Sequence, residues 1–107
     1  MQNEATFHII GRIGSVDIRE KVAFISVAAN RNYEKDGEWK AQTHWNNVSV
    51  FRKDLRERLE KANKGDLVRI TGVLYQNNRE VDGTTVYETN VVGERFAILA
   101  PKSGSEE

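Results

Sequence analysis

Apolar residues recur at every second position along most of this 107-residue chain, which is the spacing expected of β-strands. Five segments show this period or a short apolar run of strand length: Thr6–Ile13, Val22–Ala29, Thr43–Phe51, Leu67–Tyr75 and Thr85–Val92. The segment at residues 22–29 is apolar at both odd and even positions, so we expect it to be buried on both faces. A chain with this pattern is predicted to be mostly β-structure.

One segment, from Asp54 to Asn63, breaks this rhythm. Its apolar residues Leu55, Leu59 and Ala62 are spaced by four and three, which predicts one short amphipathic helix. Asp54 is expected to be the N-cap, and Gly65 is expected to end the helix. A helix of about ten residues is not stable alone, so we expect it to cover an apolar part of the fold.

The order of these elements is three strands, a helix between the third and fourth strands, and two further strands. This order predicts an all-β, five-stranded OB-fold, a small and partly open barrel. Asp36–Gly37 and Asp82–Gly83 predict hairpin turns, and Gly14 predicts a bend or bulge. The length allows one domain, which we place at residues 1–100, followed by a short flexible acidic tail at residues 101–107.

Several classes of protein are excluded or disfavoured by what the sequence lacks. No apolar run approaches the ~20 residues of a membrane-spanning helix. The absence of cysteine excludes disulfides and thiolate zinc sites, and it is compatible with a reducing cytoplasm. His8 and His44 have no accompanying metal-ligand pattern, and a histidine near a sheet edge is the simpler interpretation of His44. We therefore expect no metal, no cofactor and no enzymatic activity.

The net charge is zero, but its distribution along the chain is uneven. Residues 1–38 have a net charge of −1, residues 39–79 of +5, and residues 80–107 of −4. This division predicts a basic middle beside an acidic end, which would suit a polyanionic partner. A solvated helix face with scattered charges explains the same pattern, so charge alone does not distinguish such a face from a surface that binds a polyanion.

The aromatic residues are more informative because several have polar neighbours. Trp45 and Phe51 share a face of their predicted strand with Asn47 and Ser49. Tyr75 has a similar polar environment, and Tyr33 and Trp39 are predicted to lie in the loop after the second strand. Exposed rings among cations suit single-stranded nucleic acid, because each ring can stack on a base for roughly 1–3 kcal/mol. The alternative is that these rings lie under the helix or in a subunit interface.

The segment from Gln42 to Phe51 resembles a strand of bacterial-type single-stranded DNA-binding proteins, Gln-Thr-Glu-Trp-x-x-Val-x-x-Phe. Two further segments, Phe7–Gly14 and Lys64–Gly72, support the resemblance, which extends over about residues 6–96. It implies an OB-fold that coats single-stranded DNA without strong sequence preference in replication, recombination and repair. It also implies a homotetramer or homodimer in the bacterial cytoplasm, associated with the nucleoid.

The resemblance places Trp45, Phe51 and Tyr33 at base-stacking positions, and Lys53 and Lys64 at positions that present cations to the DNA backbone. Together with the aromatic and basic pattern, it gives the full set of candidate nucleic-acid-binding residues: Arg31, Tyr33, Trp39, Lys40, Trp45, Phe51, Lys53, Lys64, Tyr75 and Arg79.

There are four departures from the family pattern. In the first loop, the chain has Val16–Asp17–Ile18 where Asp-Pro is usual. Arg79 stands where a stacking aromatic is usual, with Tyr75 as the candidate to compensate, and Asn46 stands where a histidine involved in tetramer contacts can occur. The sequence also stops at Glu107 without the acidic, hydrophobic tail tip that recruits partner enzymes. It is therefore expected to be either a shortened form of a longer protein or a short relative that does not recruit them.

Two alternatives to a DNA-coating protein remain open from the sequence. The first is a short primosome-type OB-fold dimer whose main role is protein–protein interaction. The second is a pure interaction module in which the aromatic residues form a subunit interface.

Overall fold

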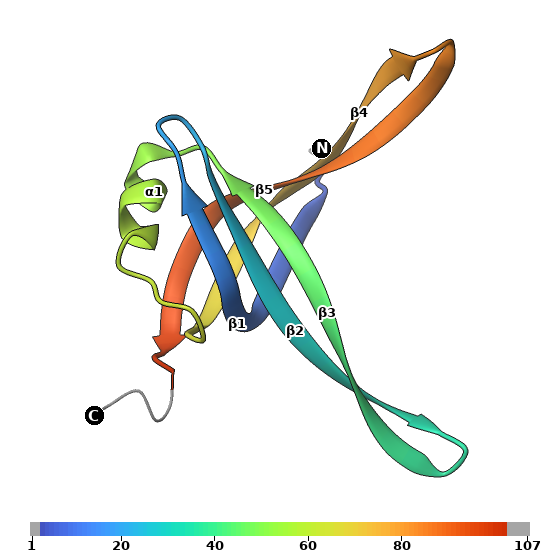
Figure 1. Cartoon of the computed structure of the whole chain (residues 1–107), viewed down its shortest axis with the longest axis vertical. Coiled ribbons are helices and arrows are strands. Elements are labelled where there is room, and N and C mark those ends of the chain that lie inside the picture. The colour runs from blue at the N-terminus through green and yellow to red at the C-terminus, as the bar shows by residue number, and fades with distance from the viewer. Residues whose placement is uncertain (1–2, 103–107) are drawn as a thin grey trace.

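A computed structural model describes residues 3–102, and its strands form a closed barrel with the order β1-β2-β3-β5-β4 (Figure 1). The elements are β1 (Thr6–Ile18), β2 (Ala23–Lys35), β3 (Glu38–Val50), α1 (Lys53–Leu59), β4 (Leu67–Val81) and β5 (Thr84–Ala100). This is the predicted OB-fold, with the helix between β3 and β4. The barrel is closed rather than partly open, because a parallel pairing of Ser49 with Val92 joins β3 to β5.

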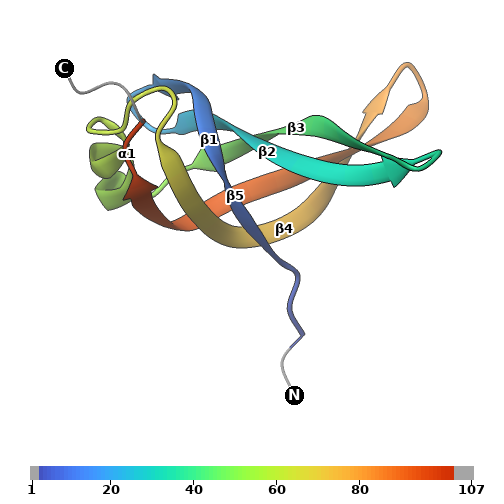
Figure 2. The same cartoon turned by 90° about the horizontal axis from the view of Figure 1, so that it is seen from below.

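The strands are longer than the sequence pattern predicts, and two hairpins extend well beyond the barrel (Figures 1 and 2). We call residues 29–44 the β2–β3 arm and residues 75–90 the β4–β5 arm. Both arms turn at the predicted Asp–Gly pairs, where Asp36, Gly37, Asp82 and Gly83 all have φ between 53° and 80°. Positive φ at both central residues is the requirement of a type I′ turn, whose twist matches that of the paired strands.

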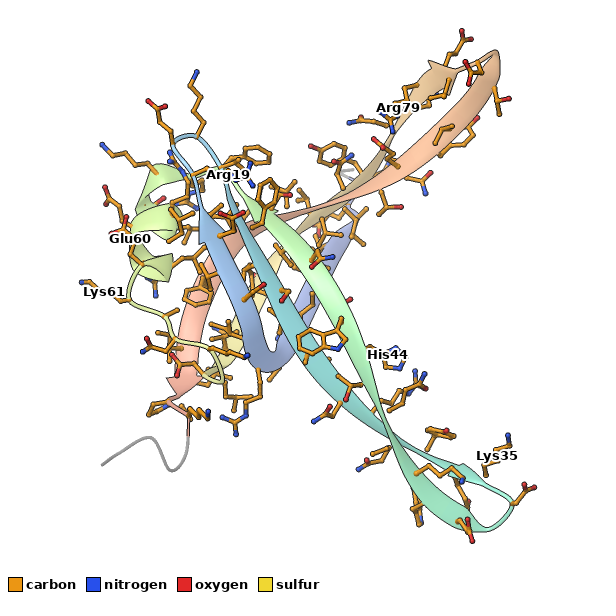
Figure 3. All side chains as sticks on the ribbon, viewed as in Figure 1. Arg19, Lys35, His44, Glu60, Lys61 and Arg79 are labelled. Carbon is orange, nitrogen blue, oxygen red and sulfur yellow. The ribbon has the colours of Figure 1, made fainter. Side chains whose placement is uncertain are left out.

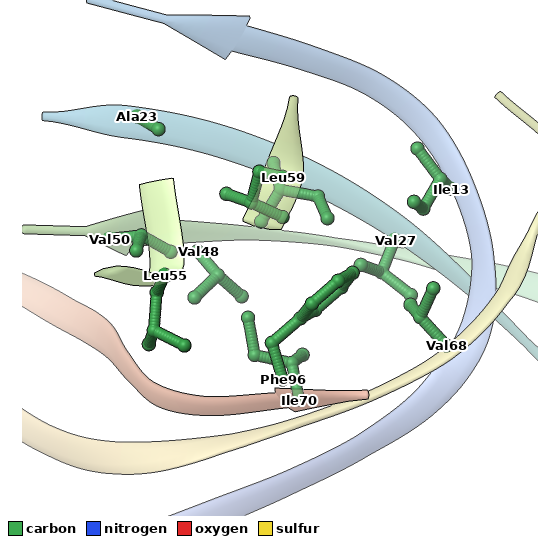
Figure 4. Close-up of a cluster of buried hydrophobic side chains, with 11 residues drawn as sticks. Ile13, Ala23, Val27, Val48, Val50, Leu55, Leu59, Val68, Ile70 and Phe96 are labelled. Carbon is green, nitrogen blue, oxygen red and sulfur yellow. The ribbon is translucent and has the colours of Figure 1, made fainter. Parts of the chain in front are cut away.

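The core lies inside the barrel, where the side chains of every strand and of α1 meet (Figure 4). In β2, Ala23, Ile25 and Val27 are fully buried while Phe24 is exposed. The prediction that residues 22–29 are buried on both faces is therefore wrong. A closed barrel has one inner and one outer wall, so even an apolar strand exposes alternate side chains.

Helix α1 packs against the barrel through Leu55 and Leu59, which confirms that the short helix covers an apolar surface. Its N-cap is Arg52, with no side-chain capping bond, so the prediction of Asp54 as the cap is wrong. Asp54 lies further in, within the first turn, and its carboxylate accepts two hydrogen bonds from Arg52. The helix ends at Leu59, well before Gly65, whose N–H instead donates to the carbonyl of Ile13.

Gly14 lies at an irregularity in the pairing of β1 with β2, where the register shifts between Ile13 and Ser15. This confirms the predicted bend or bulge at that glycine. Most of the predicted acidic tail, residues 103–107, lies outside the described residues. Within residues 3–102, no helix is long and apolar enough to cross a membrane.

Candidate nucleic-acid interface

Trp45 lies on the outer wall of the barrel at the base of the β2–β3 arm, opposite Ala28 of β2. A Cβ atom built on Gly14 would lie only 2.3 Å from the six-membered ring of the indole, so the ring packs directly over this glycine. The residue nevertheless remains 61% exposed. The missing side chain at Gly14 therefore makes room for an aromatic ring that is held on one side and open to solvent on the other.

The β2–β3 arm carries aromatic residues on both of its faces. Residues that pair directly across two antiparallel strands point to the same face. Tyr33 pairs with Lys40 and so shares a face with it, whereas Trp39 pairs with Glu34 on the other face, which it shares with Trp45. All of these side chains are exposed, and Trp39 is 73% exposed. Two tryptophans therefore lie on one face of this ribbon, one near its tip and one at its base.

The prediction that Tyr33 and Trp39 lie in a loop is wrong, because both belong to paired strands of the arm. The arm is polar, and a two-stranded ribbon beyond the barrel buries little, so its strands show no apolar alternation. Arg31 pairs with Gln42 on the face of Tyr33 and Lys40. Figure 3 shows the side chains of this arm pointing away from both sides of the ribbon, with His44 and Lys35 labelled.

Phe51 lies immediately after β3 and is 52% exposed, so neither it nor Trp45 is buried under the helix. Its carbonyl accepts a hydrogen bond from Nε of Arg56. Lys53 begins α1, two residues after Phe51 in the chain. Lys64 lies in the segment between α1 and β4, at the side of the barrel away from the tips of both arms (Figure 1). The structure thus groups Phe51 and Lys53, and it separates Lys64 from the arms.

Tyr75 and Arg79 both lie on β4 in the β4–β5 arm and point to the same face. Arg79 does not present a free charge, because its guanidinium forms an ion pair with Glu88 of β5, with 3.0 Å between Nη2 and Oε2. Lys40 of the other arm has a looser partner in Glu38, at 3.8 Å. Both predicted cations are exposed, but Arg79 is the more firmly neutralised.

Tyr87 is an exposed aromatic residue that the sequence interpretation does not identify, although it is 66% exposed on β5. It pairs with Asn78 and points to the opposite face of the β4–β5 arm from Tyr75 and Arg79. The signal is present in the sequence, since Tyr87 shares its strand face with Thr85 and Thr89. An aromatic residue with polar neighbours on its own face is the same pattern that identifies Trp45.

The basic middle and the acidic end of the sequence are not separate in the β4–β5 arm. Arg79, in the basic middle of the sequence, lies beside Glu88 of the acidic end because β4 and β5 are paired. The predicted division into a basic middle and an acidic end is therefore wrong for the β4–β5 arm. Antiparallel pairing brings the two charge types together.

Near Phe51, the hydrogen bonds from the Arg52 guanidinium hold the pKa of Asp54 below its ordinary value. A depressed carboxyl pKa means that Asp54 stays ionised throughout the neutral range. The pair favours the folded chain above the pKa of the unfolded carboxyl, and this contribution disappears as the pH falls through the lowered pKa. At neutral pH, Arg52 is thus partnered by a charged carboxylate.

A closed five-stranded barrel of this topology, with a helix between β3 and β4, defines the chain as an OB-fold protein. The sequence model of the single-strand binding protein family matches residues 5–99, and the chain belongs to this family. The resemblance seen in the third-strand motif is thereby confirmed. The family consists of DNA-binding proteins rather than enzymes, in agreement with the prediction from the sequence.

Similar curated proteins include single-stranded DNA-binding protein 3 of Streptococcus agalactiae, which is 32% identical over 89 residues, covering 82% of this chain and 64% of that protein. The single-stranded DNA-binding protein of Streptococcus mutans is 34% identical, covering 81% of this chain and 53% of that protein. The chain therefore spans about half to two thirds of the length of these relatives.

Solved structures share the fold at lower sequence identity. The Plasmodium falciparum SSB, solved in complex with single-stranded DNA, superposes with a TM-score of 0.73 at 22% identity, covering 92% of this chain and 97% of that one. The mitochondrial single-stranded DNA-binding protein Rim1 of S. cerevisiae gives a TM-score of 0.71 at 22% identity, covering 94% and 100%.

Proposed function

We propose that this protein binds and coats single-stranded DNA without strong sequence preference. The observation that carries the proposal is Trp45, which is held over Gly14 on the outer wall and yet remains largely exposed. A ring fixed in this way loses little conformational freedom when a base stacks on it. Stacking is tolerant of sequence because every base has a π-face.

In this proposal, bases stack on Trp45 and Phe51, and also on Tyr33, Trp39 and Tyr75 of the arms. The phosphates are held by the remaining candidate residues, Arg31, Lys40, Lys53, Lys64 and Arg79, of which Arg79 has to exchange its ion pair with Glu88 for the phosphate. The exposure of these side chains supports the assignment. Because the aromatic residues occupy both faces of the β2–β3 arm, the DNA has to pass around the arm to reach all of them.

The biological setting belongs to the same proposal. Similarity to bacterial relatives supports a role in replication, recombination and repair, in the cytoplasm and at the nucleoid. Assembly as a homotetramer or homodimer is also part of the proposal. Native mass spectrometry of the protein with and without DNA would measure the number of subunits.

The direct test is a titration with oligo-dT while tryptophan fluorescence is followed. The chain has two tryptophans, Trp39 and Trp45, and both lie on β3. Stacking should quench their emission, and the affinity should fall with salt by a slope of about 0.7 for each phosphate contacted. Unchanged emission together with no salt-sensitive binding would reject the proposal. A mixed-sequence oligonucleotide of equal length is the control for sequence preference.

The exposure of Trp45 also fits a subunit or partner interface, so a protein-interaction module is the second candidate function. In a pure interaction module, Trp45→Ala would change the number of subunits and leave the affinity for DNA unaltered. In a protein adaptor, DNA binding would be weak beside tight binding to a partner protein. The titration and the native mass together separate these two cases from a DNA-coating protein.

A further inference from the structure

Four arginines surround one open cavity of about 420 Å³ where α1 meets β4 and β5: Arg52, Arg58, Arg69 and Arg95. We call this the arginine pocket. None of the candidate interface residues from the sequence lines it. Both ribbon views show α1 beside the C-terminal part of β5 (Figures 1 and 2). Residues of both elements line the pocket.

Two of the four arginines belong to α1 and its N-cap, one to β4 and one to β5, and the fold places all of them around one cavity. Arg69 of β4 pairs with Ala97, and Arg95 of β5 pairs with Thr71, so both arginines lie on one face of the β4–β5 sheet. Arg58 of α1 lies over the ring of Phe96, 6.0 Å from its centroid. Arg52, just before the helix, donates to the carbonyl of Glu94 at 2.9 Å.

The charges of the pocket are only partly balanced. Its carboxylates are Asp54, which pairs with Arg52 at 2.7 Å, and Glu94. Within residues 3–102, Arg58, Arg69 and Arg95 form no ion pair with a carboxylate. A cavity with four cations and two anions retains a positive charge, which favours an anionic ligand.

The chemistry of the lining favours phosphate. The planar guanidinium group can donate two parallel hydrogen bonds to a phosphate, which makes arginine the preferred partner for this group. The apolar members Leu55 and Phe96 are buried, so the cavity offers little exposed apolar surface. An acidic peptide that also carried hydrophobic side chains would find little to pack against here.

The position of the pocket connects it with the proposed DNA interface. Phe51 directly precedes Arg52, and the parallel pairing of Ser49 with Val92 brings this end of β3 beside β5. Trp45 and Phe51 are separated by six residues of extended chain, which is about 20 Å. A strand stacked on both rings therefore arrives at the rim of the arginine pocket.

We propose that the arginine pocket binds a backbone phosphate of single-stranded DNA after the strand has passed Phe51. The DNA then leaves β3 and continues around the outside of the barrel over β5 and β4, beside α1. This inference rests on the proposed function, because it extends the path of the same DNA.

The test compares the wild-type protein with the double variant Arg69→Gln/Arg95→Gln. The control is Lys21→Gln/Lys61→Gln, which removes two exposed positive charges outside the pocket. Binding of long oligo-dT is measured at several salt concentrations, and thermal melting checks the fold of each variant. We expect the pocket variant to bind three- to tenfold more weakly at low salt, with a salt slope reduced by about 0.7 for each phosphate that it no longer binds. The affinity of the control should fall much less.

A second variant, Arg69→Lys/Arg95→Lys, keeps both charges and should restore most of the salt slope. Equal affinity and slope in the wild type, the pocket variant and the control would overturn the inference while leaving the proposed function intact. Failure of the wild type and the control to bind oligo-dT would instead overturn the proposed function itself, and this inference with it.

Calorimetry with inorganic phosphate and with hexaglutamate distinguishes other anions from DNA. If either probe binds the wild type but not the pocket variant, while DNA binding is the same in both, the pocket is an anion site away from the DNA path. That result would also overturn the inference.

Discussion

The two arms leave the same barrel and end in the same Asp–Gly turn, but they carry different side chains. The β2–β3 arm holds three cations, Arg31, Lys35 and Lys40, against three carboxylates, and it carries Tyr33 and Trp39, with Trp45 at its base. The β4–β5 arm holds two tyrosines and a single cation, Arg79, against three carboxylates, Glu80, Asp82 and Glu88.

The comparison separates backbone geometry, which the two arms share, from side-chain charge, in which they differ. Two ribbons with the same turn are expected to differ in their attraction for a polyanion, because one is neutral and the other is acidic. The β4–β5 arm also ties its one cation to Glu88. We therefore expect the β2–β3 arm to contribute more to the affinity for DNA.

The largest effect should come from removing the ring at the base of the β2–β3 arm. Trp45→Ala should weaken binding to oligo-dT by about tenfold or more, since stacking contributes roughly 1–3 kcal/mol per base. Tyr87→Ala, which removes an exposed ring from the other arm, should lower the affinity for oligo-dT by less than about threefold. Fluorescence anisotropy of labelled oligo-dT measures the affinity of both variants. A larger loss of affinity for Tyr87→Ala would reverse the comparison.

A smaller effect should follow from disturbing the contact between the Trp45 ring and Gly14. Gly14→Ala adds a Cβ where the indole now lies, and it should weaken DNA binding by about three- to tenfold by displacing the ring. The same substitution in a Trp45→Ala background should have little further effect on binding, because no ring remains to be displaced.

Thermal melting and a second glycine separate this local effect from damage to the barrel. A Cβ on Gly11 would lie 2.2 Å from the backbone oxygen of Ala28, so Gly11→Ala should lower the melting temperature more than Gly14→Ala does. If Gly14→Ala weakens DNA binding equally with and without Trp45, the contact between Gly14 and the Trp45 ring does not position the ring for DNA.

The smallest expected effect is a gain in DNA affinity when a negative charge is removed from the β4–β5 arm. Glu88→Gln removes the carboxylate that pairs with Arg79 and should tighten binding to DNA by about twofold at low salt. Glu80→Gln is the matched control, since it removes the same charge from the same arm but leaves the ion pair of Arg79 in place. Equal gains from the two variants would show that only the net charge of the arm matters.

Much of the barrel can be predicted from the sequence, because burial leaves a periodic record in the chain. Val48 and Val50 alternate with polar residues, and both point into the core. The Asp–Gly turns are also recognisable, since they need residues that tolerate positive φ. The helix is recognisable by the spacing of Leu55 and Leu59, but its first residues are not, because Arg52 competes for the carboxylate of Asp54.

The length of the arms and the electrostatics of the interface cannot be predicted in the same way. Residues of a two-stranded ribbon in solvent bury no core face, so Tyr33 and Trp39 lack the alternation that identifies a strand. The ion pair of Arg79 with Glu88 depends on the register of β4 and β5, and so does the placement of Arg69 and Arg95 on one face. That register becomes visible only when the strands are placed side by side.

The parallel contact between Ser49 and Val92 also bears on how the molecule can respond to a ligand. Along the rest of the barrel, neighbouring strands pair over many residues. The seam between β3 and β5 has a single registered pair among the described residues. A small change in the angle between the two hairpins breaks few main-chain bonds there. The seam is thus the place where opening the barrel costs the fewest main-chain hydrogen bonds.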